Sequence, residues 1–252
     1  MSTTGVTPTS ATGVGLSSGS APGLDAAALA ALTRQLGGGT VDVRAGKGHA
    51  WEETGGLAGL RAGGVEVGFV GVSTVLGDPA HPADGCAALP WLEPGLPVKV
   101  FAAEGCTAPG RYELTLAQVA ALTARTGDSR LVLVETHHGY APVGELVDLC
   151  ERAGTGILLD TMGLARITDD PAAAAARLAT WTTYGQVKGF DWADPAGSRH
   201  RPLASCAGPT REVLAAAGAL RAVTVESKAP SLAEDTALLL DWYAAGASRA
   251  IA

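Results

Sequence analysis

Three strand-like runs of the sequence end in a carboxylate, and together these groups suit acid–base chemistry or the binding of a cation. The runs are VLVE, ILLD and VTVE, which end at Glu135, Asp160 and Glu226. Carboxylates that lie close together repel one another unless a cation or a proton compensates their charge. If the three run ends meet in space, they indicate a divalent metal with hard oxygen ligands or a set of acid–base groups.

Two histidines follow the first of these carboxylates. Residues 131–140 read LVLVETHHGY, so His137 comes two residues after Glu135. We predict that Glu135 is a ligand or a base and that His137 reaches the same cleft as a catalytic group. The alternative, favoured for His138, is a loop histidine bonded to the backbone.

A basic cluster follows the run at residues 40–44. Its sequence, RAGKGH, contains Arg44, Lys47 and His49, and its glycines allow the backbone to approach a ligand closely. A guanidinium binds carboxylate or phosphate groups with two parallel hydrogen bonds. These residues are therefore predicted to bind an anionic group of a substrate, although a salt bridge from Arg44 to an acid of a neighbouring strand is an equal alternative.

The run at residues 185–190, GQVKGF, places Gln186 and Lys188 on one face of a strand. We predict that Lys188 lies within this strand and points into the site, where its ammonium group neutralises the carboxylates in place of a metal. His200, in the segment RHRPL, is predicted to bind substrate, with a solvated rim histidine as the alternative. Aromatic side chains that could cover a ligand, or simply pack at the rim, are Trp51, Trp192 and Tyr140.

Eight short apolar runs that could form strands alternate with Ala- and Leu-rich helical patterns. They lie at residues 13–17, 40–44, 65–72, 98–102, 131–135, 156–160, 185–190 and 222–226. They begin about 30 residues apart, which is the size of a βα unit with a helical crossover. This alternation predicts an α/β protein with a single-domain (β/α)8 TIM barrel over residues 12–252, preceded by a flexible tail at residues 1–11. The carboxylates would then meet at the C-terminal face of the barrel.

Local signals locate several helices. Asp25 and the pair Asp170–Pro171 have the pattern of a helix start, and capping-box spacing is present at Thr115 and at Ser231. Proline and glycine crowd residues 74–97, where a short or irregular helix is expected. No GxGxxG motif follows the first run, which argues against a dinucleotide-binding fold.

The composition narrows the class of protein. Of 252 residues, 47% are hydrophobic and 17% are charged, which is typical of a globular protein with a large core. The net charge of -7 disfavours nucleic acid as a partner, and no apolar run is long enough to span a membrane. The first residues lack the pattern of a secretory signal, so we expect a cytoplasmic protein. Its four cysteines form no close pair, which indicates scattered thiols.

With these motifs in place, the chain resembles the xylose isomerase-like, sugar-phosphate isomerase/epimerase superfamily of TIM barrels. The resemblance covers most of the chain from residue 12 onward. It is carried by the segments VDVRAGKGHAW (41–51), LVLVETHHG (131–139), GILLDTMG (156–163), GQVKGFD (185–191), RHRPL (199–203) and VTVES (223–227).

That resemblance implies a metal site. In the superfamily a Glu, an Asp, a His and a Glu on strands five to eight hold one divalent ion, and the two glutamates often form an acid–base pair. The matching positions here are Glu135, Asp160, Gln186 and Glu226, with an amide in place of the histidine, while Gly163 replaces a second frequent histidine. An amide oxygen suits Mg or Mn better than Zn or Co. A metal-free site is an open alternative.

Three functions remain open from the sequence. The first is an isomerase or epimerase that moves a proton next to a carbonyl of a small polyhydroxylated or keto substrate, with or without a metal. The second is a metal-independent cyclase, lyase or dehydratase of a natural-product pathway, whose sign would be a large apolar pocket. The third is a non-catalytic binding protein. The resemblance also implies a homodimer or tetramer.

Overall fold

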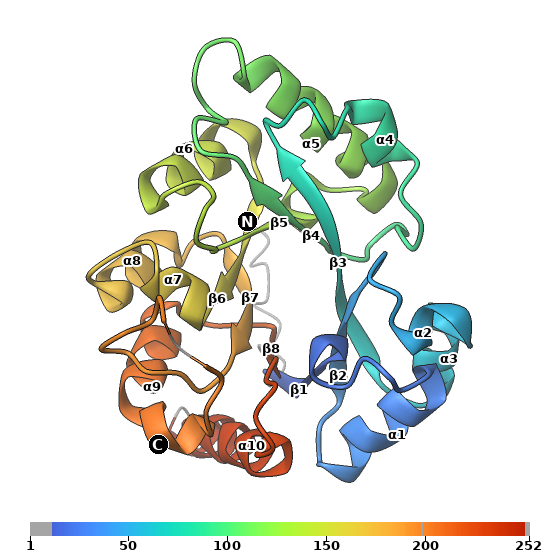
Figure 1. Ribbon diagram of the computed structural model, residues 1–252, viewed down its shortest axis with the longest axis vertical. Helices are drawn as coiled ribbons and strands as arrows, with labels where there is room; N and C mark the ends of the chain where they lie inside the picture. The colour runs from blue at the N-terminus through green and yellow to red at the C-terminus, as the bar shows by residue number, and fades with distance from the viewer. Residues whose placement is uncertain (1–11, 198, 250–252) are drawn as a thin grey trace, which may run out of the picture.

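The eight predicted strands close into a parallel barrel in sequence order (Figure 1). The computed structural model describes residues 12–197 and 199–249, so the predicted tail at residues 1–11 lies outside the described residues. The strands are β1 (Gly13–Ser17), β2 (Thr40–Arg44), β3 (Glu66–Leu76), β4 (Val98–Ala102), β5 (Val132–Glu135), β6 (Gly156–Asp160), β7 (Thr182–Val187) and β8 (Ala222–Val225). The single-domain (β/α)8 barrel is confirmed.

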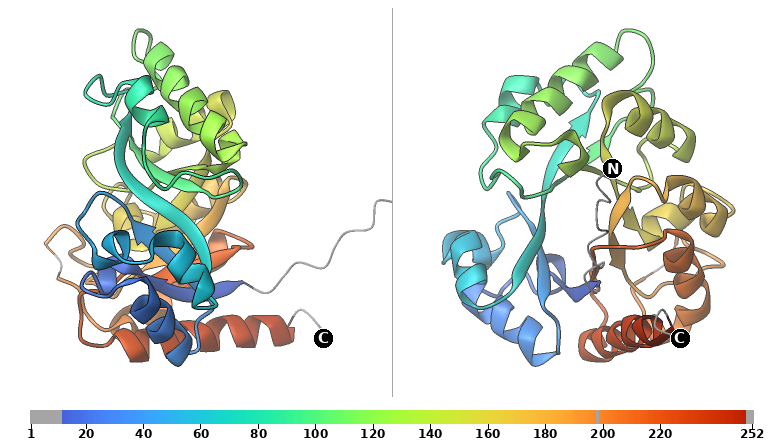
Figure 2. Two further views of the ribbon diagram at one scale, coloured as in Figure 1. Left: turned by 90° about the vertical axis from the view of Figure 1, so that its right-hand side faces the viewer. Right: turned by 180° about the vertical axis from the view of Figure 1, so that it is seen from behind.

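The helices lie outside the strands, and α10 runs beside β1 in the side view of Figure 2. The α-helices are α1 (Ala26–Gln35), α2 (Ala50–Glu53), α3 (Gly56–Ala62), α4 (Ala83–Ala87), α5 (Tyr112–Thr126), α6 (Val143–Ala153), α7 (Thr161–Ala165), α8 (Pro171–Leu178), α9 (Ala207–Ala216) and α10 (Leu232–Arg249). Short 3-10 turns are η1 (Ser18–Ser20), η2 (Ser129–Leu131) and η3 (Leu203–Cys206). Within the described residues, no helix combines the length and apolar character needed to cross a membrane.

The interior of the barrel is filled in layers, because alternate residues of each strand point inward. An apolar cluster fills it with Phe69, Leu133, Leu158, Tyr184 and Ala222. Two residues further along the strands comes a polar layer with Asp42, Gln186 and Thr224. The same alternation then brings the charged residues to the C-terminal ends of the strands: Arg44, Glu135, Asp160, Lys188 and Glu226.

Two strands, β3 and β7, differ from their predicted bounds by more than one residue. β3 runs on to Leu76, because it pairs with β4 in two stretches separated by a register shift. The crowded segment that follows holds only the five-residue α4, as expected. β7 begins three residues earlier than predicted and ends at Val187, so Lys188 follows the strand instead of lying within it.

The helix-start signals gave mixed results. Asp25 and Asp170 each cap a helix by accepting a hydrogen bond from a backbone N–H of its first turn, as predicted. The signal at Thr115 was wrong, since α5 already begins at Tyr112 and the Thr115 hydroxyl donates to the carbonyls of Cys106 and Arg111, which precede the helix. Ser231 does precede α10, where its hydroxyl donates to Asp235. All four cysteines are buried free thiols, as the sequence indicated.

Candidate active site

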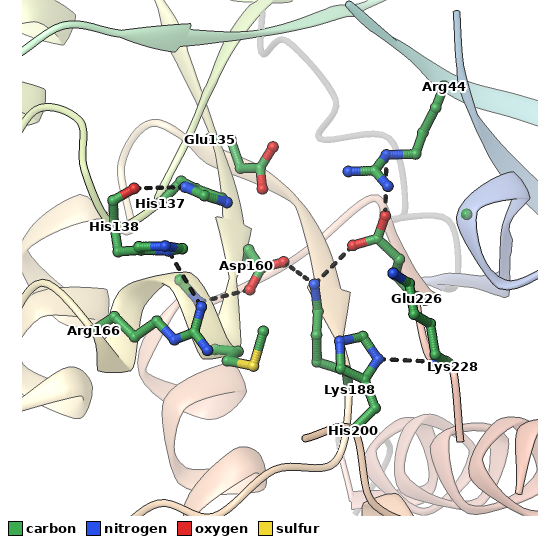
Figure 3. Close-up of a pocket in the computed structure, with 13 residues that line it drawn as sticks. Arg44, Glu135, His137, His138, Asp160, Arg166, Lys188, His200, Glu226 and Lys228 are labelled. Carbon is green, nitrogen blue, oxygen red and sulfur yellow. Dashed lines mark hydrogen bonds and ion pairs between the residues drawn. The ribbon is translucent and has the colours of Figure 1, made fainter. Parts of the chain in front are cut away.

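A pocket opens at the C-terminal end of the barrel, where the predicted carboxylates converge (Figure 3). Its volume is about 170 Å³, below the roughly 300–1,000 Å³ of sites for drug-sized ligands. The described residues that line it are Gly19, Arg44, Glu135, His137, His138, Asp160, Met162, Gly163, Arg166, Lys188, His200, Glu226 and Lys228. None is a Trp, Phe or Tyr, so the pocket suits a small polar molecule and lacks the apolar character expected of the natural-product alternative.

Lys188 links two of the carboxylates. Its Nζ lies 2.5 Å from Asp160 Oδ2 and 2.7 Å from Glu226 Oε2, and all three side chains are buried. Burial alone would favour the neutral amine, but Asp160 and Glu226 together raise the pKa of Lys188 above its ordinary value. Lys188 is therefore a fixed cation between two anions, which is the arrangement the sequence suggested.

Glu226 is held as an anion from two sides. Arg44 Nε lies 3.3 Å from its Oε1, opposite the contact that Lys188 makes with Oε2. Although burial opposes ionisation, Lys188 and Arg44 lower the pKa of Glu226 to about 2. The raised pKa that the metal-free reading assumed for a general base is thus wrong for Glu226, which is a weak base because its charge is compensated.

Both carboxylate oxygens of Asp160 also have partners. Its Oδ1 accepts a hydrogen bond of 2.7 Å from the backbone N–H of Gly163, and its Oδ2 contacts Lys188. A Cβ at Gly163 would lie 1.9 Å from the carbonyl oxygen of Thr136. The local backbone therefore requires glycine at the position where the superfamily often has a histidine.

Glu135 has a different partner. Lys99, on β4, places its Nζ 2.6 Å from Glu135 Oε2 and 3.8 Å from the centre of the Phe101 ring. The other oxygen, Oε1, makes no ion pair within the described part of the chain. In Figure 3 the carboxylate projects towards the pocket. Lys99 was not predicted from the sequence, although a lysine inside the aliphatic run VKV was a signal that its side chain points inward beside an acid.

His137 lies beside Glu135 in a stack of rings. It contacts Phe101, Tyr140 and His138, at centroid distances of 5.2, 5.4 and 4.5 Å. Its Nδ1 is 2.8 Å from the carbonyl oxygen of His138, which can only accept, so the proton of His137 is on Nδ1. The Nε2 of neutral His137 is then a proton acceptor. The structure therefore brings His137 to the pocket, as predicted, and Tyr140 supports it from behind.

His200 is held in the opposite tautomer. The backbone N–H of Lys228 donates to its Nδ1 over 2.9 Å, so the proton of neutral His200 is on Nε2. Burial and the nearby Lys188 lower the pKa of His200, which favours this neutral form. His200 is thus a hydrogen-bond donor in the pocket wall, consistent with its predicted role in substrate binding.

The basic residues after β2 differ in whether they reach the pocket. Arg44 lines the pocket through its pair with Glu226, so the salt-bridge alternative holds for it. Lys47 is exposed, and His49 caps α2 and lies 3.1 Å from the Ser18 hydroxyl. Trp51 is fully buried against Trp91, and its indole N–H donates to a backbone carbonyl. The structure does not bring these last three to the pocket.

Trp192 and Asp191 do not line the pocket either. Trp192 lies against Phe190, with ring centroids 4.6 Å apart, and outside the pocket. Asp191 forms an ion pair with Arg201 at 3.1 Å. Both residues thus belong to the loop that follows β7.

A buried acid beneath the pocket was not predicted. Asp42, on β2, accepts hydrogen bonds from Ser17, Thr224 and the amide nitrogen of Gln186. Burial and the charge of Glu226 raise the pKa of Asp42 to about 7, against the opposing effect of these hydrogen bonds. Gln186, predicted as a metal ligand, is therefore directed at the layer below the site. The signal for Asp42 was an acid in mid-strand, in TVDVR.

This raised pKa makes stability depend on pH. An unfolded Asp42 ionises near pH 3.8, whereas the folded protein keeps the proton up to about pH 7. The folded state binds more protons in that interval, so this group lowers stability as pH rises through it. Between pH 4 and pH 8, we expect the free energy of unfolding of D42N to rise relative to that of the wild type by up to about 4 kcal/mol. Urea unfolding at each pH measures this difference. A gap that does not change with pH would contradict the assignment.

Solved structures with the same architecture include an L-ribulose 3-epimerase, with a TM-score of 0.63 at 14% identity, covering 95% of this chain and 97% of that one. A xylose isomerase domain containing protein from Salmonella typhimurium LT2 has a TM-score of 0.60 at 15% identity, covering 98% and 100%. A probable 3-DHS dehydratase from Bacillus anthracis has 0.60 at 14% identity, covering 91% and 98%. The chain shares the closed (β/α)8 barrel fold of these structures. No protein-family model and no curated protein sequence matches it.

The donor set of this barrel does not fit the divalent ion that the sequence resemblance implied. Asp160 and Glu226 share the Lys188 ammonium, and Glu135 pairs with a second lysine. Gln186 donates its amide hydrogens to another residue. Across residues 12–197 and 199–249, no three His, Cys, Asp or Glu side chains are grouped for a metal. A lysine ammonium stands where a metal would have to bind.

Proposed function

We propose that the protein is an isomerase that transfers a proton next to the carbonyl of a small polar substrate, with Glu135 as its single base and no metal. The observation that carries this proposal is the unequal state of the three carboxylates. Asp160 and Glu226 both pair with Lys188, whereas Glu135, among the residues that the structure describes, keeps one oxygen without an ion pair at the pocket. The epimerases and the xylose isomerase domain protein that share the fold support this class of reaction.

The chemistry needs a base and a cation. Glu135 removes the proton from the carbon beside the carbonyl, and the electrons of that C–H bond pass to the carbonyl oxygen. The Lys188 ammonium stabilises the resulting oxyanion, and it stays charged because Asp160 and Glu226 raise its pKa. Glu135 then returns the proton to the former carbonyl carbon. The hydroxyl on the carbon that lost the proton becomes the new carbonyl, as its own proton passes to the first oxygen.

The low pKa of Glu226 favours one-base chemistry over the two-glutamate exchange implied by the resemblance. Epimerisation by removal on one face and return on the other requires a second group that takes up a proton near neutral pH. Glu226, with a pKa of about 2, is poorly suited to that task. A 1,2-shift of the carbonyl needs only Glu135, because the proton leaves and returns on the same side.

A second candidate is dehydration, and His137 is the observation that favours it. Its Nε2 faces the site as a proton acceptor and, once protonated, it can give that proton to a departing hydroxide. Glu135 removes the carbon-bound proton, the C–O bond at the next carbon breaks, and the hydroxide leaves as water. The fold shared with a probable 3-DHS dehydratase supports this alternative.

One experiment separates these reactions. The protein is incubated in D2O with a panel of pentuloses, hexuloses, their phosphates and polyhydroxylated carboxylic acids, and the products are followed by NMR and mass spectrometry. Isomerisation adds deuterium at the carbon beside the carbonyl, whereas dehydration removes the mass of water. Parallel reactions with chelator or with added Mn²⁺ are expected to proceed at the same rate. Binding without exchange or turnover would favour the non-catalytic alternative instead.

Gly19 provides a test of how tightly Glu226 must be placed. A Cβ there would lie 2.7 Å from Glu226 Oε1 and 3.2 Å from Arg44 Cδ. Both are flexible side chains, so G19A is expected to fold normally but to displace the Glu226 carboxylate. Turnover should fall roughly 10- to 100-fold. The matched control is G23A, since nothing lies within 4 Å of a Cβ at Gly23. Wild-type turnover in G19A would argue against a placed Glu226.

A further inference from the structure

Arg166 lies in the pocket wall directly after α7, on the side opposite Arg44 and Glu226 (Figure 3). Arg166 is half-buried, and within the described residues its guanidinium donates three hydrogen bonds, all to neutral acceptors. The acceptors are the carbonyl oxygens of Pro195 at 2.6 Å and Ala196 at 3.5 Å, and His138 Nδ1 at 3.2 Å. These contacts fix the plane of the guanidinium without compensating its charge.

Among the described residues, Arg166 forms no ion pair with an Asp or a Glu. A guanidinium has five N–H groups, and the three bonds leave one on Nη1 and one on Nη2. Two parallel N–H groups on the terminal nitrogens match the two oxygens of a carboxylate or phosphate. Arg166 thus presents a positioned, uncompensated cation to the pocket.

The contact with Arg166 also sets the tautomer of His138. Because arginine can only donate, His138 Nδ1 must accept, and the proton of neutral His138 is on Nε2. Burial, His137 and Arg166 lower the pKa of His138, so it is neutral at physiological pH. His138, predicted from the sequence to be only a loop histidine, is therefore a second hydrogen-bond donor in the same wall.

The pocket as a whole has an excess of positive charge. Its lining contains four cations, Arg44, Arg166, Lys188 and Lys228, against three carboxylates. Lys99 adds a further cation behind Glu135. This excess contrasts with the net charge of -7 for the whole chain, so the positive charge is concentrated at the site.

We infer that Arg166 and His138 form an oxyanion subsite, and that the substrate carries a carboxylate or phosphate group at the end remote from Glu226. This assignment deepens the proposed function and rests on it for the identity of the molecule as a substrate. The subsite itself rests on the uncompensated guanidinium, the donor tautomer of His138 and the cationic lining. The bound oxyanion holds the reacting carbon between Glu135 and Lys188.

The test is direct titration with two probes, inorganic phosphate and pyruvate, followed by calorimetry or thermal shift at low ionic strength. We expect R166Q to bind the preferred probe at least tenfold more weakly than the wild type. The control R177Q removes one positive charge from an exposed position on α8 and should bind like the wild type. The stronger probe identifies the oxyanion as carboxylate or phosphate. Unchanged affinity in R166Q, or no binding of either probe to the wild type, overturns the inference.

Further variants separate binding from loop support, since Arg166 also contacts the carbonyls of Pro195 and Ala196. H138F keeps a ring against His137 but removes the donor, and it should weaken binding about fivefold, whereas H138Q, which keeps an N–H, should restore most of it. Equal losses in both would indicate a structural role only. E135Q should bind the probes like the wild type even when it is inactive, so failure of the proposed chemistry is distinguishable from failure of the subsite.

Discussion

Replacing Lys188 with methionine is expected to destabilise the protein by about 3–5 kcal/mol at neutral pH and to abolish turnover. Removing one partner of a buried ion pair leaves an uncompensated charge, and here two are left, on Asp160 and Glu226. Methionine preserves most of the volume of lysine, so the loss reports charge and not a cavity. Urea unfolding measures the stability, and the D2O exchange assay measures the chemistry.

The destabilisation of K188M should depend on pH in a defined way. Glu226 has a depressed pKa, so its contribution is fully present above its unfolded value of 4.5 and is lost as pH falls through about 2. Lys188 has a raised pKa, so its contribution is fully present below 10.5 and is lost as pH rises through its folded value. The difference between wild type and K188M is therefore largest between about pH 4.5 and 10.5.

Two controls sharpen this test. The double variant K188M/E226Q also removes the negative charge of Glu226, which K188M leaves uncompensated. It should recover part of the stability but none of the turnover. K188M is expected to gain affinity for Mn²⁺, because Asp160 and Glu226 then lack their cation. A K188M protein as stable as the wild type throughout this pH range would show that the carboxylates are compensated by something other than Lys188.

The sequence was sufficient for the fold and for one half of the site. Its runs ending in Glu135, Asp160 and Glu226 located three strand ends, and the closure of a (β/α)8 barrel then required them to meet at one face. The alternation of side chains along each strand placed these acids above the apolar layer without any knowledge of loops. Local information was enough because each prediction depended on one strand at a time.

The pairing across the barrel was not accessible in the same way. Lys99 faces Glu135 because of the register between the paired strands β4 and β5, and Asp42 on β2 meets Gln186 on β7 across the barrel interior. β7 also ends three residues before its predicted end, which places Lys188 just after the strand and not within it. Whether a metal ion or a lysine compensates the carboxylates therefore depends on how the strands are placed in three dimensions. The residues for both arrangements were visible in the sequence.

The second large effect is expected at the proposed base. E135Q should lower the rate of proton exchange by roughly 10³-fold, within the range for loss of a positioned acid–base group. Glutamine keeps the shape of glutamate but cannot take up the proton from carbon. It also leaves Lys99, which is 5% exposed, without its carboxylate, so some loss of stability is expected as well.

E135D separates these two effects. Aspartate keeps the negative charge that compensates Lys99 but withdraws the carboxylate by one methylene group from the pocket. We expect E135D to retain more of the wild-type stability than E135Q while its exchange rate falls by roughly 100-fold, because a base must lie within hydrogen-bonding reach of the proton it removes. If E135Q instead retained the wild-type exchange rate, Glu135 would be only the counter-ion of Lys99. The base would then have to be His137, whose Nε2 is the remaining neutral proton acceptor assigned in the pocket wall.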